Sequence, residues 1–161
     1  MLDEMFELAS KGWAAARGTA ISSTPTLRDF YRDLALLAQR KGWLHFGLLR
    51  NRERLCAFEF NISYHGRLYG LKTAYDPAFS SIGPGHVLIW KILDSLFPGP
   101  HLIEEFDLGG TDAAYKLRWT SLTRTYSKMH LFNPASHYAQ SLFQFECLLR
   151  KVQEALPKAQ K

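Results

Sequence analysis

The chain has 161 residues, of which 47% are apolar and 22% charged, and its formal net charge is +5. This length suits one soluble domain with its own core, and the composition excludes a disordered or fibrous chain. The basic excess is small and dispersed along the sequence. It argues against a DNA-binding protein and is compatible with an anionic small ligand.

Cysteine usage and the N-terminus bear on the compartment. Cys56 and Cys147 are the only cysteines, and both lie in apolar segments far apart in the chain. They are interpreted as buried, reduced thiols. The opening stretch MLDEMFELASKGW has acids where a secretory signal has bases, and no apolar run approaches the ~20 residues of a membrane span. We therefore expect a cytoplasmic protein.

Two helices are predicted near the N-terminus. The apolar spacing over residues 4–16 predicts a short helix that is broken at Gly18, with an extended GTAIS stretch after it. Residues 24–41 carry the clearest helical pattern. Thr24 suits the N-cap of this helix, and Pro25 suits its first position.

Three strands are predicted next, over residues 43–50, 56–64 and 67–75, as an antiparallel meander. The even positions of the second strand are apolar, and its odd positions are small or polar, namely Ala57, Glu59, Asn61 and Ser63. This period of two predicts that one face is buried. The arginines of the first turn are interpreted as a solvated hairpin tip rather than an anion site; they are Arg50, Arg52 and Arg54.

The second half alternates helices and strands. The expected elements are a helix over 84–97, a strand over 102–110, a short helix over 111–119, a strand over 121–132 and a helix over 134–155. Since no linker or repeat interrupts them, we expect a single domain over 1–161. The order predicts an α/β (α+β) fold whose mixed, mostly antiparallel sheet is flanked by helices. The crossover around the helix at 84–97 should be parallel and right-handed.

The stretch SSIGPGHVLIW at residues 80–90 places two glycines around a proline at the start of a helix. The first amides of a helix have no intrahelical partner, and the helix dipole there favours an anion. Glycine lets a phosphate approach such amides closely. Gly83 and Gly85 therefore fit a pyrophosphate cradle, and an ordinary helix start is the alternative.

The spacing of this loop resembles the coenzyme A loop of the GNAT acyltransferase superfamily, usually Q/R-x-x-G-x-G/A; Ser80 stands where Gln or Arg is usual. The pieces GW...GTA at 12–20, LKTAYDPAFSSIGPGHVLIWKIL at 71–93 and FDLGGTDAAYKLRWTS at 106–121 resemble the CelD-type GNAT-like domain. Its relatives are the Fem-type aminoacyltransferases. Ala14 replaces the lysine usual in the first piece, and the chain resembles the C-terminal half of tandem members.

The resemblance implies acetyl-CoA or another acyl-CoA as co-substrate and assigns residues to it. The pyrophosphate would lie against Ile82, Gly83, Gly85 and His86. The end of the third strand would run beside the pantetheine and polarise the thioester carbonyl with a backbone amide; its residues are Lys72, Thr73, Ala74 and Tyr75.

Three catalytic candidates follow the strand at 102–110, where this architecture opens on the acceptor. Asp107 would orient or deprotonate an incoming amine, Tyr115 would protonate the leaving thiolate, and Lys116 would offset charge on the tetrahedral intermediate. The structural alternatives are a helix cap near Thr111 for Asp107, a core position for Tyr115 and a surface position for Lys116. The six histidines show no metal spacing, and no G-x-S-x-G occurs, so neither a metal nor a serine nucleophile is expected.

The predicted function is N- or O-acyl transfer by direct attack of the acceptor on the thioester. The acceptor would be a small molecule or a cell-envelope polysaccharide precursor. Two alternatives are a Fem-type transferase that takes its acyl group from aminoacyl-tRNA and a non-catalytic partner protein in polysaccharide assembly. Homodimerisation, or association with a second GNAT-like domain, would complete a site that tandem members build from two halves.

Overall fold

The computed structural model describes residues 1–12, 15, 18, 20–96, 103–110, 113–127 and 129–155. The chain divides into two compact units, Met1–Trp119 and Thr120–Lys161, and each is described by itself. The first unit contains α1 (Leu2–Lys11), α3 (Pro25–Arg40), β1 (Leu44–Asn51), β2 (Arg54–Tyr64), β3 (Arg67–Tyr75), η1 (Pro77–Ile82), α4 (Pro84–Leu96), β4 (Glu105–Asp107) and α5 (Ala114–Leu117). The second contains α6 (His137–Ala155). The expectation of one domain over 1–161 stays a prediction.

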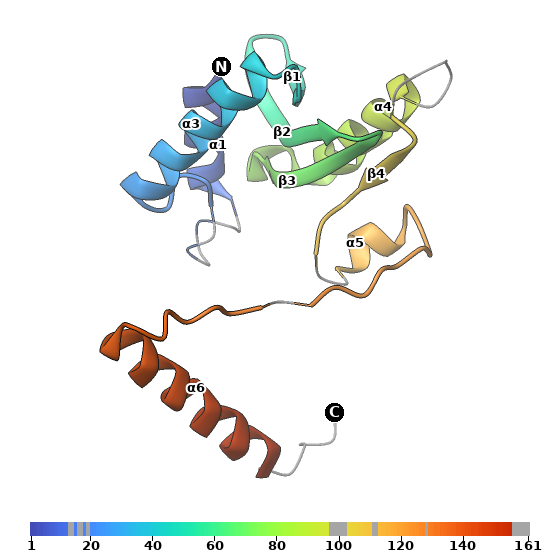
Figure 1. Cartoon of the computed structure of the whole chain (residues 1–161). Coiled ribbons are helices and arrows are strands. Elements are labelled where there is room, and N and C mark those ends of the chain that lie inside the picture. The colour runs from blue at the N-terminus through green and yellow to red at the C-terminus, as the bar shows by residue number, and fades with distance from the viewer. Residues whose placement is uncertain are drawn as a thin grey trace. The chain divides into compact units, whose positions relative to one another are not determined.

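The four strands form one sheet in the order β1-β2-β3-β4 (Figure 1). β2 is antiparallel to both of its neighbours, whereas β3 and β4 are parallel. The predicted meander and the parallel crossover are therefore confirmed. The strand expected over 102–110 is much shorter, because the described part of it is extended only at Glu105–Asp107 and Gly109 then takes φ +77°.

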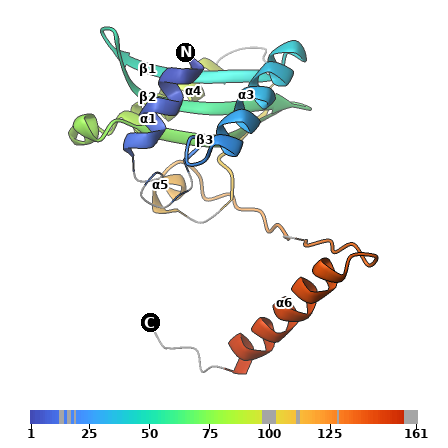
Figure 2. The same cartoon turned by 90° about the vertical axis from the view of Figure 1, so that its left-hand side faces the viewer.

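Helices cover both faces of the sheet. α1 and α3 lie on one face and α4 on the other (Figures 1 and 2). The main core lies under α1 and α3, where Phe6, Phe58 and Phe60 are 1% exposed or less. The Tyr31 ring of α3 meets Phe60 edge-on at 5.6 Å between centroids. This aromatic packing fixes α3 on the sheet.

The prediction that β2 buries only one face is wrong. Its small and polar positions are buried as well, with Ala57 0%, Glu59 5% and Asn61 1% exposed. The cause is α4, which covers this face: a Cβ added at Gly47, the β1 partner of Glu59, would lie 2.7 Å from Cδ1 of Ile92. A row of polar side chains expected in solvent is thus enclosed.

The N-terminal predictions are confirmed in part. α3 begins as expected, because Thr24 Oγ1 accepts a hydrogen bond from the Leu27 amide at 3.2 Å. The first helix ends at Lys11, short of residue 16. The prediction that GTAIS is extended is wrong for the residues that are described, because Ala20 lies in a bend and Ile21 in a turn. Both are buried, with 2% and 1% of their surface exposed.

The second unit departs most from the sequence predictions. Residues 121–132 are not a strand where they are described, and the described part of this unit contains no strand that could pair with them. β-branched and aromatic residues favour a strand only when a partner supplies hydrogen bonds. α6 begins at His137 because the Ser136 hydroxyl accepts from the Ala139 amide at 3.3 Å. Cys147 in α6 is partly exposed, so only Cys56 fits the buried thiol expected.

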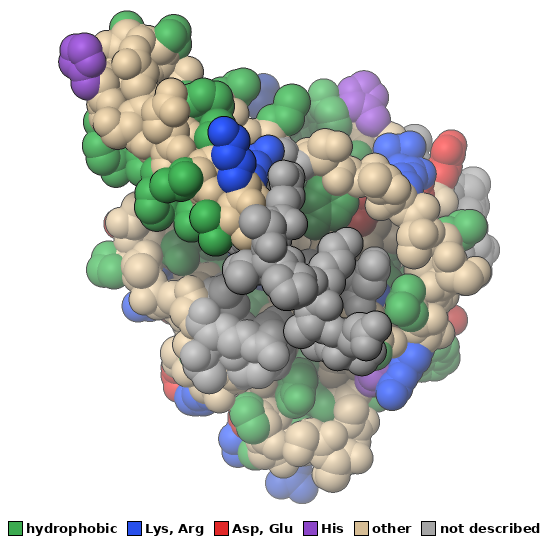
Figure 3. Space-filling model, turned by 90° about the horizontal axis from the view of Figure 1, so that it is seen from below, with side chains coloured by type: hydrophobic (Ala, Val, Ile, Leu, Met, Phe, Trp, Pro, Cys, Tyr) green, Lys and Arg blue, Asp and Glu red, His purple; other side chains and the backbone are tan. Residues whose placement is uncertain are grey.

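On one face of the molecule, the basic side chains match the dispersed pattern of the sequence. On the face in Figure 3, the Lys and Arg side chains of the described residues are scattered among neutral ones and form no continuous patch. Among the described residues, no helix has both the length and the hydropathy of a membrane span. The described part of the chain likewise contains no group of three His, Cys, Asp or Glu side chains placed to hold a metal.

Candidate active site

β3 and β4 separate soon after they pair. Their register covers only Arg67–Tyr69 and Glu105–Asp107, and β3 continues to Tyr75. No strand in the described part of the chain pairs with this last part of β3 on the β4 side. At the point of separation, a Cβ added at Gly109 would lie 2.9 Å from the Gly70 carbonyl oxygen. Gly109, with φ +77°, therefore lets the chain turn sharply away from β3.

The end of β3 presents its side chains to both faces. Lys72 pairs with Phe60, and its Nζ lies 5.8 Å from the centroid of the Tyr31 ring, on the side of α3. Ala74 belongs to the same core. Thr73 pairs with Glu59 and so shares the α4 face. Lys72 and Ala74 can serve a ligand on the α4 face only through their backbone, and the backbone role expected for them stays a prediction.

The glycine loop has a structure of its own. Gly83 takes φ +59° and ψ +52°, the left-handed conformation, and its amide donates to the Ser80 carbonyl oxygen. The His86 and Val87 amides donate to the Gly83 carbonyl oxygen at 2.9 and 3.2 Å, and Pro84 has no amide hydrogen. This leaves Gly85 as the loop amide without an acceptor in the described part of the chain.

The predicted phosphate contacts of this loop stay predictions, and the four residues differ in what their geometry offers a phosphate. Gly83 is required by the backbone conformation, since a side chain in the left-handed region is strained. Gly85 supplies the available amide at the start of α4. The side chain of Ile82 is 61% exposed, and the His86 ring lies beside Trp119 with 6.0 Å between centroids. The indole Nε1 of Trp119 is buried without a hydrogen-bond partner among the described residues.

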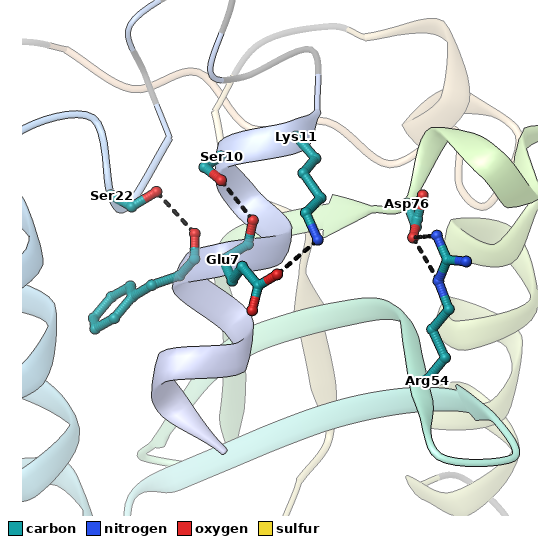
Figure 4. A network of polar contacts seen from close by, with 7 residues as sticks. Glu7, Ser10, Lys11, Ser22, Arg54 and Asp76 are labelled. Carbon is teal, nitrogen blue, oxygen red and sulfur yellow. Dashed lines mark hydrogen bonds and ion pairs between the residues drawn. The ribbon is translucent and has the colours of Figure 1, made fainter.

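An ion pair anchors the loop to the sheet. Arg54 at the start of β2 donates from Nε and Nη2 to Oδ2 of Asp76 at 3.1 and 2.6 Å (Figure 4). Oδ1 of Asp76 accepts from the Ala78 amide at 3.0 Å and so caps η1. The Ala78 amide first, and then Arg54, lower the pKa of Asp76. Arg54 is 59% exposed at the hairpin, as the interpretation of a solvated tip implies, and its ion pair with Asp76 adds a structural role.

Glu59 is the buried acid of this face. It lies at the centre of β2 opposite Thr73, with 5% of its surface exposed. Burial raises its pKa to about 7, even though a hydrogen bond from the Thr73 hydroxyl and the positive charge of Lys116 both lower it. A carboxyl group with this pKa changes its protonation state near neutral pH, as a general base must.

α5 brings two of the predicted residues toward Glu59. Burial, and then the charge of Glu59, raise the pKa of Tyr115, so this phenol stays protonated. Lys116 Nζ donates to the carbonyl oxygens of Gly109 and Gly110, each at 3.0 Å, and its charge reaches Glu59. Asp107 Oδ1 accepts from the Gly109 amide at 2.8 Å. Asp107 thus holds the turn after β4 and does not cap α5, whose N-cap is Ala113.

The first unit has nearly the same bounds as the match to a known protein family. The model of the acetyltransferase (GNAT) domain matches residues 1–117. This chain belongs to the GNAT acetyltransferase family. A solved structure, the PaiA N-acetyltransferase from Thermoplasma acidophilum in complex with coenzyme A, aligns with 14% identity and a TM-score of 0.44 over 58% of this chain. The alignment spans about 64% of that protein's length. None of the curated proteins compared with this GNAT domain matches it.

Sequence reasoning missed Glu59 in this GNAT domain, although a signal was present. The alternation in β2 places Glu59 on the polar face, which this pattern alone assigns to solvent. The predicted crossover helix must lie on one face of the sheet, because it joins two parallel strands. Since α3 and α1 cover the apolar face, α4 was bound to cover Glu59. Combining the two predictions would have identified a buried acid.

Proposed function

We propose that this GNAT domain transfers an acyl group from acyl-CoA to an amine or hydroxyl acceptor by direct attack on the thioester. The observation that carries the proposal is Glu59, a buried carboxyl group with a pKa of about 7 that lies beside Thr73 and within electrostatic reach of Tyr115 and Lys116. A structural sheet position would favour an apolar residue there, because burying a carboxylate costs free energy.

The chain's own residues accept and donate the protons that move during the transfer. The Glu59 carboxylate removes a proton from the acceptor as its N or O atom bonds to the thioester carbonyl carbon. When the C–S bond breaks, the departing sulfur takes the proton of Tyr115. Lys116 offsets negative charge at this stage, and backbone amides of Lys72–Tyr75 polarise the carbonyl group. Asp107 orients the acceptor, and solvent returns the proton from Glu59 to Tyr115.

The donor is proposed to bind at the loop before α4. Its pyrophosphate would meet the Gly85 amide and the positive end of α4, with Gly83, Ile82 and His86 around it. The motifs that resemble the CelD-type domain support a cell-envelope or polysaccharide precursor as the acceptor. The same resemblance supports pairing with a second GNAT-like domain or a second copy of this chain.

Release of the CoA thiol from acetyl-CoA in the presence of a panel of amines and alcohols tests this function. We expect release with the wild type, and a much lower rate with Glu59→Gln. The matched control is Glu53→Gln, a change at an exposed glutamate in the β1–β2 turn. Transfer from charged tRNA without release from acetyl-CoA would instead support the Fem-type donor. A stable protein partner without either transfer would support a non-catalytic role.

A further inference from the structure

Asn61 is a second buried polar residue on the α4 face of β2. It follows Glu59 by two positions, its surface is 1% exposed, and its Oδ1 atom has no hydrogen-bond partner among the described residues. A buried carbonyl oxygen without a donor costs about 1–3 kcal/mol. The proposed mechanism does not use this residue.

Asn61 and Glu59 point to the same side of the sheet. β1 pairs with β2 without interruption across both positions, and the irregularity with β3 falls at Leu71, which has no partner in the register. Alternation along a regular strand then places the two side chains on one face, with Cα atoms roughly 6.6 Å apart for a rise of about 3.3 Å per residue. Side chains of this length can reach one common atom between them.

The Oδ1 atom of Asn61 lies beside Gly70, the β3 residue opposite it. A Cβ added at Gly70 would lie 3.6 Å from this Oδ1, 3.4 Å from the Asp107 carbonyl oxygen and 3.4 Å from the Phe106 ring. The polar atoms around that point are therefore oxygen acceptors. These are ordinary contact distances, so the space at Gly70 would hold one methyl-sized group. A small group that donates hydrogen bonds, such as an ammonium or amine nitrogen, suits its oxygen neighbours, and the space lies where β3 and β4 separate.

We propose that Asn61 Oδ1 binds the acceptor substrate, by accepting a hydrogen bond from the nitrogen that Glu59 deprotonates. The inference rests on the proposed function. An amine nitrogen can donate one N–H to Asn61 while it loses another proton to Glu59, whereas a hydroxyl has a single hydrogen and can satisfy only one of them. Asn61 thereby favours N-acylation over O-acylation. Because Oδ1 is closed to solvent in the free chain, the amine can reach it only when the residues around Asn61 open.

Calorimetric titration of the CoA-loaded full chain with butylamine and with butan-1-ol tests this inference. CoA binding is measured first in the same experiment, so a missing donor site, which would overturn the proposed function, is seen separately from a missing amine site. We expect the wild type to bind butylamine about tenfold or more tightly than butan-1-ol. Absence of measurable butylamine binding, or equal affinities for the two probes, would overturn the inference.

Three variants assign the effect to Asn61. Asn61→Leu removes the acceptor oxygen and should weaken butylamine binding about tenfold, without changing CoA affinity. Asn61→Asp keeps an oxygen acceptor and should retain the preference for the amine. Gly70→Ala fills the space with a methyl group at ordinary contact distances and a compatible backbone, so it should fold and still weaken butylamine. If Asn61→Leu fails to fold, the butylamine affinity of Gly70→Ala decides whether this position binds the amine. Unchanged butylamine affinity in whichever of these two variants folds would refute the role of Asn61.

Discussion

Glu59 and Thr73 face each other across β2 and β3, and the Thr73 hydroxyl donates a hydrogen bond to the Glu59 carboxyl group inside the layer between the sheet and α4. This pair connects the local pattern of the sequence with the chemistry proposed. The strand alternation aligns the two residues, the crossover helix encloses them, and enclosure shifts the acid into the range where it can act as a base.

The pH dependence of transfer should report Glu59. We expect kcat/KM to rise with pH and level off above a pKa of about 7, because the ionised carboxylate is the active form. Glu59→Gln should lower kcat/KM about 10²–10⁴-fold and remove this dependence. Initial rates across the pH range measure both effects. A variant with the wild-type profile would exclude Glu59 as the base.

Glu59 should also oppose stability at neutral pH. Its folded pKa of about 7 lies above its ordinary value of 4.5, so the folded state binds the proton more tightly than the unfolded state. The stabilisation that the folded state gains from holding this proton is fully present below pH 4.5. It is lost as the pH rises through the folded pKa of about 7. Above that range we expect Glu59→Gln to be more stable than the wild type by about 3 kcal/mol.

Urea unfolding of both proteins at several pH values measures this difference. Folding lowers the pKa of other groups, such as Asp76 and Glu4. Their effect on the pH dependence of stability cancels in the difference between the two proteins, because both proteins retain them. A stability difference that stays constant from acid to neutral pH would show that Glu59 has an ordinary pKa in the folded state.

The Asp76 carboxyl group should stabilise the loop before α4. Asp76→Ala leaves the Ala78 amide without its cap and breaks the pair with Arg54, so we expect a loss of about 1–2 kcal/mol in the free energy of unfolding. The matched control is Asp3→Ala, because Asp3 also pairs with arginines but is 74% exposed. Equal losses in the two variants would contradict a specific role for Asp76.

Alanine substitutions at the two glycines of the loop should separate the effect of backbone strain on stability from the effect of a side chain on ligand binding. Gly83→Ala forces a side chain into the left-handed region and should cost about 1 kcal/mol of stability. Gly85→Ala lies in helical backbone, where its Cβ would meet Tyr75 at 3.9 Å, so stability should be kept or gained. Its methyl group lies beside the available amide and should weaken acetyl-CoA binding. Chemical denaturation and calorimetry of both variants check these opposite effects.

Local patterns in the sequence predicted most of the first unit. Thr24 and Pro25 marked the start of α3, the β3 limits Arg67–Tyr75 matched the prediction, and the parallel return to β4 followed from topology. The glycine pair after Asp107 marked the turn that follows β4, although the strand itself ends at Asp107 and not at residue 110. These features depend on a few neighbouring residues or on general rules of chain connection.

The features that were missed depend on contacts between distant segments. The arginine at position 54 reads as part of a polar turn until Asp76 is brought beside it. Glu59 and Asn61 read as a solvent face until α4 covers them. Residues 121–132 have the composition of a strand and lack a pairing partner within the described part of their unit, and composition alone supplies no hydrogen bonds.

Calorimetric titration with acetyl-CoA tests the central claim most directly. We predict saturable binding by the wild type with a dissociation constant near micromolar, about −8 kcal/mol, and loss of binding in Gly83→Asp, which places a carboxylate at the start of α4. Gly42→Asp is the matched control, because Gly42 also has a positive φ (+69°) and open space around it but lies after α3. The control should bind like the wild type. Absence of acetyl-CoA binding by the wild type, or unchanged binding by Gly83→Asp, would contradict a donor site at this loop.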